Sequence, residues 1–177
     1  MIKRICVLSD EKSSIIEALR EYFKDKDTEI IESSSLIEAC ECDLCILDGY
    51  KGHLKKEILD CTTFINIHKS LLPAFQGEKP VEKAVEYGAK VTGITLHYIT
   101  EENFYGKIIA QYPIFIDILT TTEELNKEMD NTAQKLVPFV ADSILKDIVF
   151  SFDVLLKPDQ CGGNCSGSCN CKNQLEI

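Results

Sequence analysis

The feature that most constrains the fold is a regular alternation of short apolar strands and amphipathic helices. Residues 43–48 are almost entirely apolar, as expected for a strand covered on both faces of a parallel sheet. Residues 4–9 read as a strand, and a capping box at Ser14–Glu17 is expected to begin a helix with one apolar stripe. A strand, a tight turn and a helix open a parallel α/β unit. We therefore predict a Rossmann-like α/β fold, a three-layer sandwich with a mostly parallel twisted sheet and helices on both faces.

The rest of the chain continues this alternation. Further strands are predicted over residues 28–32, 63–67, 90–99 and 108–116, and further helices over residues 33–41, 54–60, 79–88 and 123–150. In the second helix, we expect Leu36, Ile37 and Cys40 to face inward. Pro138 is expected to kink or split the last helix, because proline cannot donate the helical hydrogen bond.

Length and charge narrow the class of protein. The chain has 177 residues, enough for one domain with a sizeable core, which we place at residues 1–156. The net charge of −10 argues against nucleic-acid and membrane partners, and no apolar run is long enough to span a bilayer. The first residues enter a strand without a signal-peptide pattern, so we expect a cytoplasmic protein. Its nine cysteines are then expected to be thiols or metal ligands rather than disulfides.

A candidate catalytic pair stands at the end of the strand over residues 63–67. Asn66 and His68 are two positions apart, so an extended chain places both side chains on one face. An amide can hydrogen-bond a developing oxyanion, and an imidazole can move a proton near neutral pH. Ser70 and Pro73 then mark an irregular turn. We expect the pair to open onto a cleft at the rim of the sheet.

A second polar patch lies on the strand over residues 90–99. Alternation puts Thr95 and His97 on the same face. Such a histidine is most often buried and hydrogen-bonded, and would orient its neighbours without doing chemistry. We assign Ser70, Thr95 and His97 supporting roles.

Two segments resemble the folate-dependent formyltransferases, and most closely the glycinamide ribonucleotide transformylases. Residues 66–73 (Asn-Ile-His-Lys-Ser-Leu-Leu-Pro) are similar to the signature of that family. Residues 91–102 and 108–111 are similar to its next block, in the same order and spacing. The resemblance covers residues 1–150 and implies the formyltransferase fold. It also implies 10-formyltetrahydrofolate as co-substrate and an amine as acceptor, with Asn66 as oxyanion donor and His68 as general acid–base.

The resemblance also implies a folate pocket. In the family, the loop that matches residues 49–54 lines the pteridine pocket, largely through backbone groups. Gly49, Tyr50 and Leu54 stand there in this chain, together with His53, which we expect to be an exposed loop residue. From the second block, the implied folate contacts are Glu101, Glu102 and Phe104.

The chain departs from the family at two chemically important places. The family uses a glycine-rich turn for the substrate phosphate, whereas residues 9–13 (Ser-Asp-Glu-Lys-Ser) contain two carboxylates and no glycine. Lys12, Ser13 and Ser14 remain as candidate phosphate contacts. The family aspartate that steers the catalytic histidine is replaced by Phe104, whose ring can neither accept a proton nor hold an imidazole tautomer.

The tail over residues 157–177 has a different composition. Cys161, Cys165, Cys169 and Cys171 are separated only by Gly, Ser and Asn. Four thiolates suit Zn²⁺, copper or an iron–sulfur cluster, but the same composition is compatible with a flexible tail carrying reactive thiols.

Two functions from different classes follow. The first is a formyl-transfer enzyme acting on an amine that need not be glycinamide ribonucleotide, because the phosphate turn is altered. The second is a degenerate formyltransferase fold that serves as a binding module or handles a metal or iron–sulfur cluster through its tail. A monomer and a homodimer are both compatible with the sequence.

Overall fold

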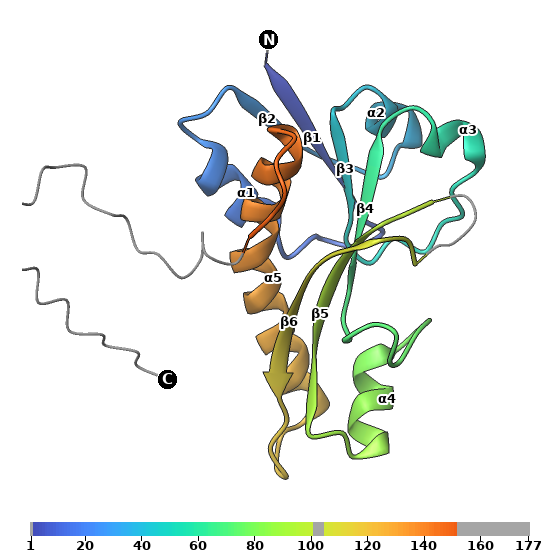
Figure 1. The fold of residues 1–177 in the computed structure, drawn as a ribbon, viewed down its shortest axis with the longest axis vertical. Coiled ribbons are helices and arrows are strands. Elements are labelled where there is room, and N and C mark those ends of the chain that lie inside the picture. The colour runs from blue at the N-terminus through green and yellow to red at the C-terminus, as the bar shows by residue number, and fades with distance from the viewer. Residues whose placement is uncertain (1, 101–104, 152–177) are drawn as a thin grey trace, which may run out of the picture.

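The computed structural model describes residues 2–100 and 105–151, which form a six-stranded sheet with helices on both faces (Figure 1). The strand order is β2-β1-β3-β4-β5-β6. The first four strands in that order run parallel, whereas β5 and β6 are antiparallel to their neighbours. The bounds are β1 (Lys3–Leu8), β2 (Thr28–Ser33), β3 (Leu44–Leu47), β4 (Thr63–His68), β5 (Val91–Tyr98) and β6 (Ile108–Phe115). The predicted mostly parallel α/β sandwich is confirmed.

The helices divide between the two faces of the sheet. One apolar cluster joins α1 (Ile16–Phe23), α4 (Pro80–Tyr87) and α5 (Thr122–Leu145) to one face, and α1 packs beside α5 (Figure 1). The second cluster joins α2 (Leu36–Cys40) and α3 (Lys56–Leu59) to the other face. Successive strand residues alternate between the clusters, since Ile5 and Val7 belong to the first and Cys6 and Leu8 to the second. We call these the α5 face and the α3 face.

Three details of the helices differ from the sequence-based expectation. The capping box at Ser14–Glu17 is wrong, because α1 begins after Ile15 without a side-chain cap and Ser14 instead contacts carboxylates of other elements. In α2, Ile37 is 75% exposed while Ala39 is buried. Pro138 lies inside α5 without splitting it, and a capping box at Thr121 and Glu124, which we did not predict, begins that helix.

The cysteine prediction is wrong at one pair. Cys40, the last residue of α2, forms a disulfide with Cys61, which follows α3 by two residues. The bond therefore ties together the two helices of the α3 face. Cys6, Cys42 and Cys45 are free thiols buried on the same face, as expected for small apolar residues.

The close approach of β5 and β6 depends on Gly93. A Cβ atom at this position would lie 2.0 Å from the Tyr112 carbonyl oxygen and 2.8 Å from Leu71 Cδ2. We expect Gly93→Ala to lower the free energy of unfolding by about 1–3 kcal/mol, because the backbone of β6 must move away. Urea denaturation of both proteins measures this difference, and an unchanged midpoint would contradict the close contact.

None of the helices within residues 2–100 and 105–151 combines the length and apolar character that crossing a membrane requires. The boundary that we predicted between a domain ending at residue 156 and a tail from residue 157 lies outside the described residues.

Candidate functional site

Polar side chains cross three neighbouring strands on the α3 face. Asn66 and His68 lie on β4 opposite His97 and Thr95 of β5, and Thr95 in turn lies opposite Gln111 of β6. We call these five residues the polar strip. Their sequence positions alternate with apolar residues such as Ile67, Ile94 and Leu96, which belong to the α5 face. Alternation therefore places the strip on the side of each strand opposite these apolar residues, as predicted within the pair Asn66 and His68 and within the pair Thr95 and His97.

Asn66 and His97 form a direct contact. The Asn66 side-chain amide nitrogen lies 3.1 Å from His97 Nε2, and His97 Nδ1 lies 3.0 Å from the Tyr98 carbonyl oxygen. A carbonyl oxygen only accepts, so Nδ1 donates to it, and Nε2 of the neutral ring accepts from the amide. His97 therefore orients the Asn66 amide, which keeps a second N–H for another acceptor. His97 is buried and hydrogen-bonded, as expected from the sequence, and its supporting role stays a prediction.

His68 is oriented by the loop that follows its strand. Its Nε2 lies 3.2 Å from the Phe75 carbonyl oxygen, so Nε2 donates, and the lone pair of the neutral ring is on Nδ1. Burial lowers the pKa of His68 below its ordinary value, and the charges of His97 and Lys83 act in the same direction, against the bond to Phe75. Burial likewise lowers the pKa of His97. Both imidazoles are therefore neutral at pH 7, the form in which His68 can accept a proton.

A buried hydrogen-bond network fixes the turn after β4. The Thr95 hydroxyl donates to the Ser70 carbonyl and accepts from the Leu72 amide, and Ser70 Oγ donates to the Ala74 carbonyl. Gln111 donates to Thr95 Oγ1 at 3.0 Å and to the Leu72 carbonyl at 2.9 Å. Ser70 and Thr95 thus support the position of His68 through the backbone. Gln111 belongs to the same network, although only its place in the resembling block pointed to it.

Side chains of the polar strip are nearly inaccessible in the described structure, whereas we expected the Asn66/His68 pair to face an open cleft. Asn66 and His68 are each 7% exposed, and His97 is 0% exposed. The ring of Tyr105 lies over both imidazoles, with its centroid 5.5 Å from that of His68 and 5.7 Å from that of His97. Its hydroxyl accepts a hydrogen bond from the Gly77 amide at 2.5 Å. We did not predict these contacts of Tyr105 from the sequence, because its partners His68 and Gly77 are distant along the chain.

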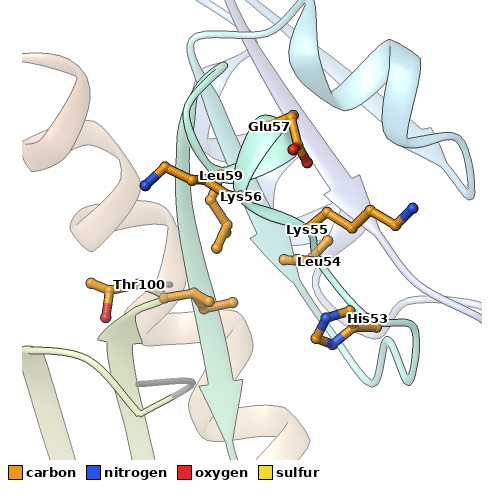
Figure 2. Close-up of a pocket in the computed structure, with 8 residues that line it drawn as sticks. His53, Leu54, Lys55, Lys56, Glu57, Leu59 and Thr100 are labelled. Atoms are coloured by element: carbon orange, nitrogen blue, oxygen red, sulfur yellow. The ribbon is translucent and has the colours of Figure 1, made fainter. Parts of the chain in front are cut away.

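A pocket lies next to the polar strip on the α3 face. Ile99, two positions after His97, and Thr100 line the pocket together with side chains between His53 and Leu59. Figure 2 shows Thr100 opposite that segment. The pocket measures about 390 Å³, a size typical of small-molecule sites. Leu54 forms part of its wall, and its role as a folate contact stays a prediction, whereas His53 is exposed as predicted. Gly49 and Tyr50 lie on the preceding loop, where Gly49 has a φ of +73° and Tyr50 packs against the apolar cluster of the α3 face.

The turn predicted as a phosphate contact is already bound by carboxylates. The Ser13 amide donates to Glu32, and the Ser14 amide and the Ser13 hydroxyl donate to Asp48 at 3.2 and 2.7 Å. Lys12 is exposed on the same turn. Amide groups at a helix start bind phosphate only if they point at it, and here they point at internal carboxylates.

Several predicted site residues lie outside the described residues. These are the implied folate contacts Glu101, Glu102 and Phe104 and the four tail cysteines Cys161, Cys165, Cys169 and Cys171. Within residues 2–100 and 105–151, no group of three or more His, Cys, Asp or Glu side chains is arranged to hold a metal ion. The zinc, copper or iron–sulfur site of the tail stays a prediction.

The buried histidines make stability depend on pH. Because the native pKa values of His68 and His97 are lowered, the unfolded chain binds more protons as the pH falls below about 6.5. We therefore expect the melting temperature to be constant above pH 7 and to fall as the pH is lowered through 6.5 toward the native pKa values. Calorimetry between pH 5 and 8 measures this fall. His68→Gln should show a smaller fall, and an equal fall would assign the effect to other groups.

Comparison with known proteins identifies similar sequences and folds. A family described as formyl transferase matches residues 5–141. Methionyl-tRNA formyltransferase of Pseudothermotoga lettingae is 37% identical over 97 residues, which is 54% of this chain and 32% of the relative. Phosphoribosylglycinamide formyltransferase of Bacillus subtilis is 39% identical over 107 residues, 59% of this chain and 55% of the relative. The chain thus spans about a third to a half of the length of these curated relatives.

A solved structure extends the likeness to the fold. Phosphoribosylglycinamide formyltransferase from Anaplasma phagocytophilum matches with a TM-score of 0.70 and 26% identity, over 81% of this chain and 87% of that protein. The predicted resemblance is therefore confirmed in sequence and in architecture.

Proposed function

This chain belongs to the formyl transferase family, and from that premise we propose that it transfers a formyl group from 10-formyltetrahydrofolate to an amine. The observation that carries the proposal is the pairing of Asn66 and His68 on the α3 face, with Asn66 oriented by His97 and His68 neutral. An oriented amide can stabilise the oxygen that gains negative charge, and a neutral imidazole can accept the proton of the attacking amine.

His68 is proposed to move the proton. As the amine attacks the formyl carbon, His68 accepts a proton from the amine nitrogen, and Asn66 donates its second N–H to the oxygen that gains negative charge. The protonated imidazole of His68 then interacts with the same oxygen and adds a positive charge to the neutral hydrogen bond from Asn66. His68 returns the proton to the folate nitrogen as its bond to the formyl carbon breaks, so the imidazole ends neutral and the formyl group rests on the amine.

The pocket beside the strip is proposed to hold the pteridine of the folate. It lies on the same face as His97 and continues from Ile99 and Thr100, so a ring bound there would extend toward Asn66 and His68. Leu54, Leu59 and Ile99 supply an apolar wall, and Lys55, Lys56 and Glu57 supply charged groups at its rim. Apolar walls with a few polar groups are typical of pockets for planar ligands.

We propose that the formyl acceptor is an amine that is not bound through a phosphate group at residues 9–14. The amides of Ser13 and Ser14 donate to Glu32 and Asp48, and Asp10 accepts from the Lys51 amide. A phosphate brought to this turn would meet three carboxylates and would have to displace two of them. An amine that places no phosphate at this turn avoids both the repulsion by the carboxylates and the need to displace them.

A second function, folate binding without transfer, is favoured by one observation. The Tyr105 ring covers both imidazoles, and Asn66 and His68 are only 7% exposed. In that case the protein would bind folate but show no turnover, and the tail cysteines would carry its activity. Metal analysis after anaerobic purification, with Cys161→Ser and Cys165→Ser as controls, tests the role of the tail.

The pocket is tested with a matched pair of variants on α3. Leu59 lines the pocket, whereas Ile58 packs against the same apolar cluster without lining it, and both side chains are partly buried. We expect Leu59→Ala to weaken binding of 10-formyltetrahydrofolate roughly 10-fold in calorimetric titration, because it removes apolar contact area from the ligand. Ile58→Ala should bind as the wild type does. Equal effects of both variants, or no binding by the wild type, would contradict the proposed site.

A further inference from the structure

Tyr105 is the residue whose position neither the sequence nor the family pattern explains. It stands one position after Phe104, at the place where β5 connects to β6. The backbone beside it is fixed, because the Gly106 amide donates to the Tyr98 carbonyl at 3.0 Å and the Tyr98 amide donates to the Lys107 carbonyl at 2.9 Å. A Cβ atom at Gly106 would lie 2.4 Å from the Tyr98 carbonyl oxygen, so this approach requires glycine.

The Tyr105 side chain crosses from this fixed backbone to another loop. Its ring stands edge-on to His68, at an interplanar angle of 80°, and is tilted by 43° relative to His97. Its hydroxyl accepts from the Gly77 amide, in the loop that also presents the Phe75 carbonyl to His68. The phenol ring thus touches both histidines of the strip and the loop that orients one of them.

We propose that Tyr105 is a positioning residue that closes the Asn66/His68 site in the free protein and must rotate away before a substrate reaches His68. The structure favours a side-chain motion, because the backbone of residues 106–107 is hydrogen-bonded to β5, whereas the hydroxyl of the ring reaches across to the Gly77 amide. Closing keeps water from the imidazoles, and opening gives up the hydrogen bond to Gly77 and the ring contacts with His68 and His97. The idea that the formyl donor enters once Tyr105 has rotated rests on the proposed function, whereas closure of the site in the free protein does not.

The closing is tested without any folate. The chain has three histidines, and His53 is exposed, so it serves as an internal reference. Diethyl pyrocarbonate acylates neutral imidazoles, and mass spectrometry gives the rate at each histidine. We expect Tyr105→Ala to raise the rate at His68 at least 5-fold and to leave the rate at His53 unchanged. Tyr105→Phe keeps the ring but loses the hydrogen bond to Gly77, so its rate of acylation at His68 should lie between those of the wild type and Tyr105→Ala.

A spectroscopic measurement separates shielding from a general loosening of the fold. The groups whose charges act on His68 are His97 and Lys83, and neither is changed in these variants. The pKa of His68 should therefore be higher in Tyr105→Ala, closer to 6.5, because water replaces the ring, and NMR titration measures this change. Unchanged acylation and an unchanged titration of His68 in both variants would overturn the proposal.

The last measurement links the ring to the donor. If Tyr105 must leave, the apparent affinity of the wild type for 10-formyltetrahydrofolate is reduced by the fraction of closed molecules. Tyr105→Ala should then bind the donor roughly 5-fold more tightly, and weaker binding would overturn the role in access. A wild type that binds no donor at all would instead overturn the proposed function, and the folate-free acylation rates would still decide whether Tyr105 closes the site.

Discussion

Replacing His68 by alanine is expected to lower kcat for formyl transfer by about 10²–10⁴-fold, the usual worth of a positioned acid–base group. The free ring is neutral, because burial lowers the pKa of His68, so it accepts the amine proton without first losing one of its own. The donor should still bind within about 2-fold of the wild type, since the pocket wall from His53 to Leu59 does not include His68. Stopped-flow or steady-state assays with a range of amine acceptors measure kcat, and fluorescence titration measures donor binding.

Two further variants make this result specific. Asn66→Ala should lower kcat by about 10²–10³-fold, the effect of losing one oxyanion donor. Thr92→Val is the matched control, because Thr92 is also buried in the sheet, on the opposite face of β5 from Thr95 and His97, and its hydroxyl has no hydrogen-bond partner. It should leave kcat unchanged and stabilise the fold slightly. A fall in kcat in Thr92→Val as large as in His68→Ala would mean that the assay reports folding rather than chemistry.

The scaffold and the polar strip were predictable from local patterns. Strand positions such as residues 44–47 are apolar without interruption, and the alternation around Asn66 and His68 fixes which face each side chain takes. The pairing of Asn66 with His97 follows once β4 and β5 are neighbours, because the register puts these two residues opposite each other. These features depend on residues close in sequence or on a regular sheet, and both leave a periodic signal.

Two features of the site that we did not predict from the sequence join distant segments by side chains. Tyr105 reaches Gly77 across 28 positions, and Ser13 reaches Asp48 across 35. In each case the sequence shows that a phenol or a carboxylate is present, but its partner depends on the three-dimensional course of a loop. The capping box at Thr121 and Glu124 is a different case, because it spans only three residues; its local signal is present in the sequence, although we did not predict it.

Removing the Cys40–Cys61 disulfide is expected to lower the free energy of unfolding by about 3 kcal/mol. The bond closes a loop with a sequence separation of 21 residues, and a cross-link of this length restricts the unfolded chain by about that amount. The loop contains β3 and α3, so the bond also holds the α3 side of the pocket, where Lys56, Glu57 and Leu59 lie. We therefore expect Cys40→Ser/Cys61→Ser to unfold at lower urea concentration and to bind the folate donor more weakly.

Reductant provides the matched comparison, because the chain contains other cysteines. Dithiothreitol should shift the urea midpoint of the wild type down to that of Cys40→Ser/Cys61→Ser and should leave the double variant unchanged. Any shift that remains in the double variant would belong to Cys6, Cys42, Cys45 or the cysteines after residue 160. A wild type that is indifferent to the reductant would show that residues 40 and 61 are free thiols in solution. It would restore the original expectation that a chain of this kind keeps its cysteines reduced.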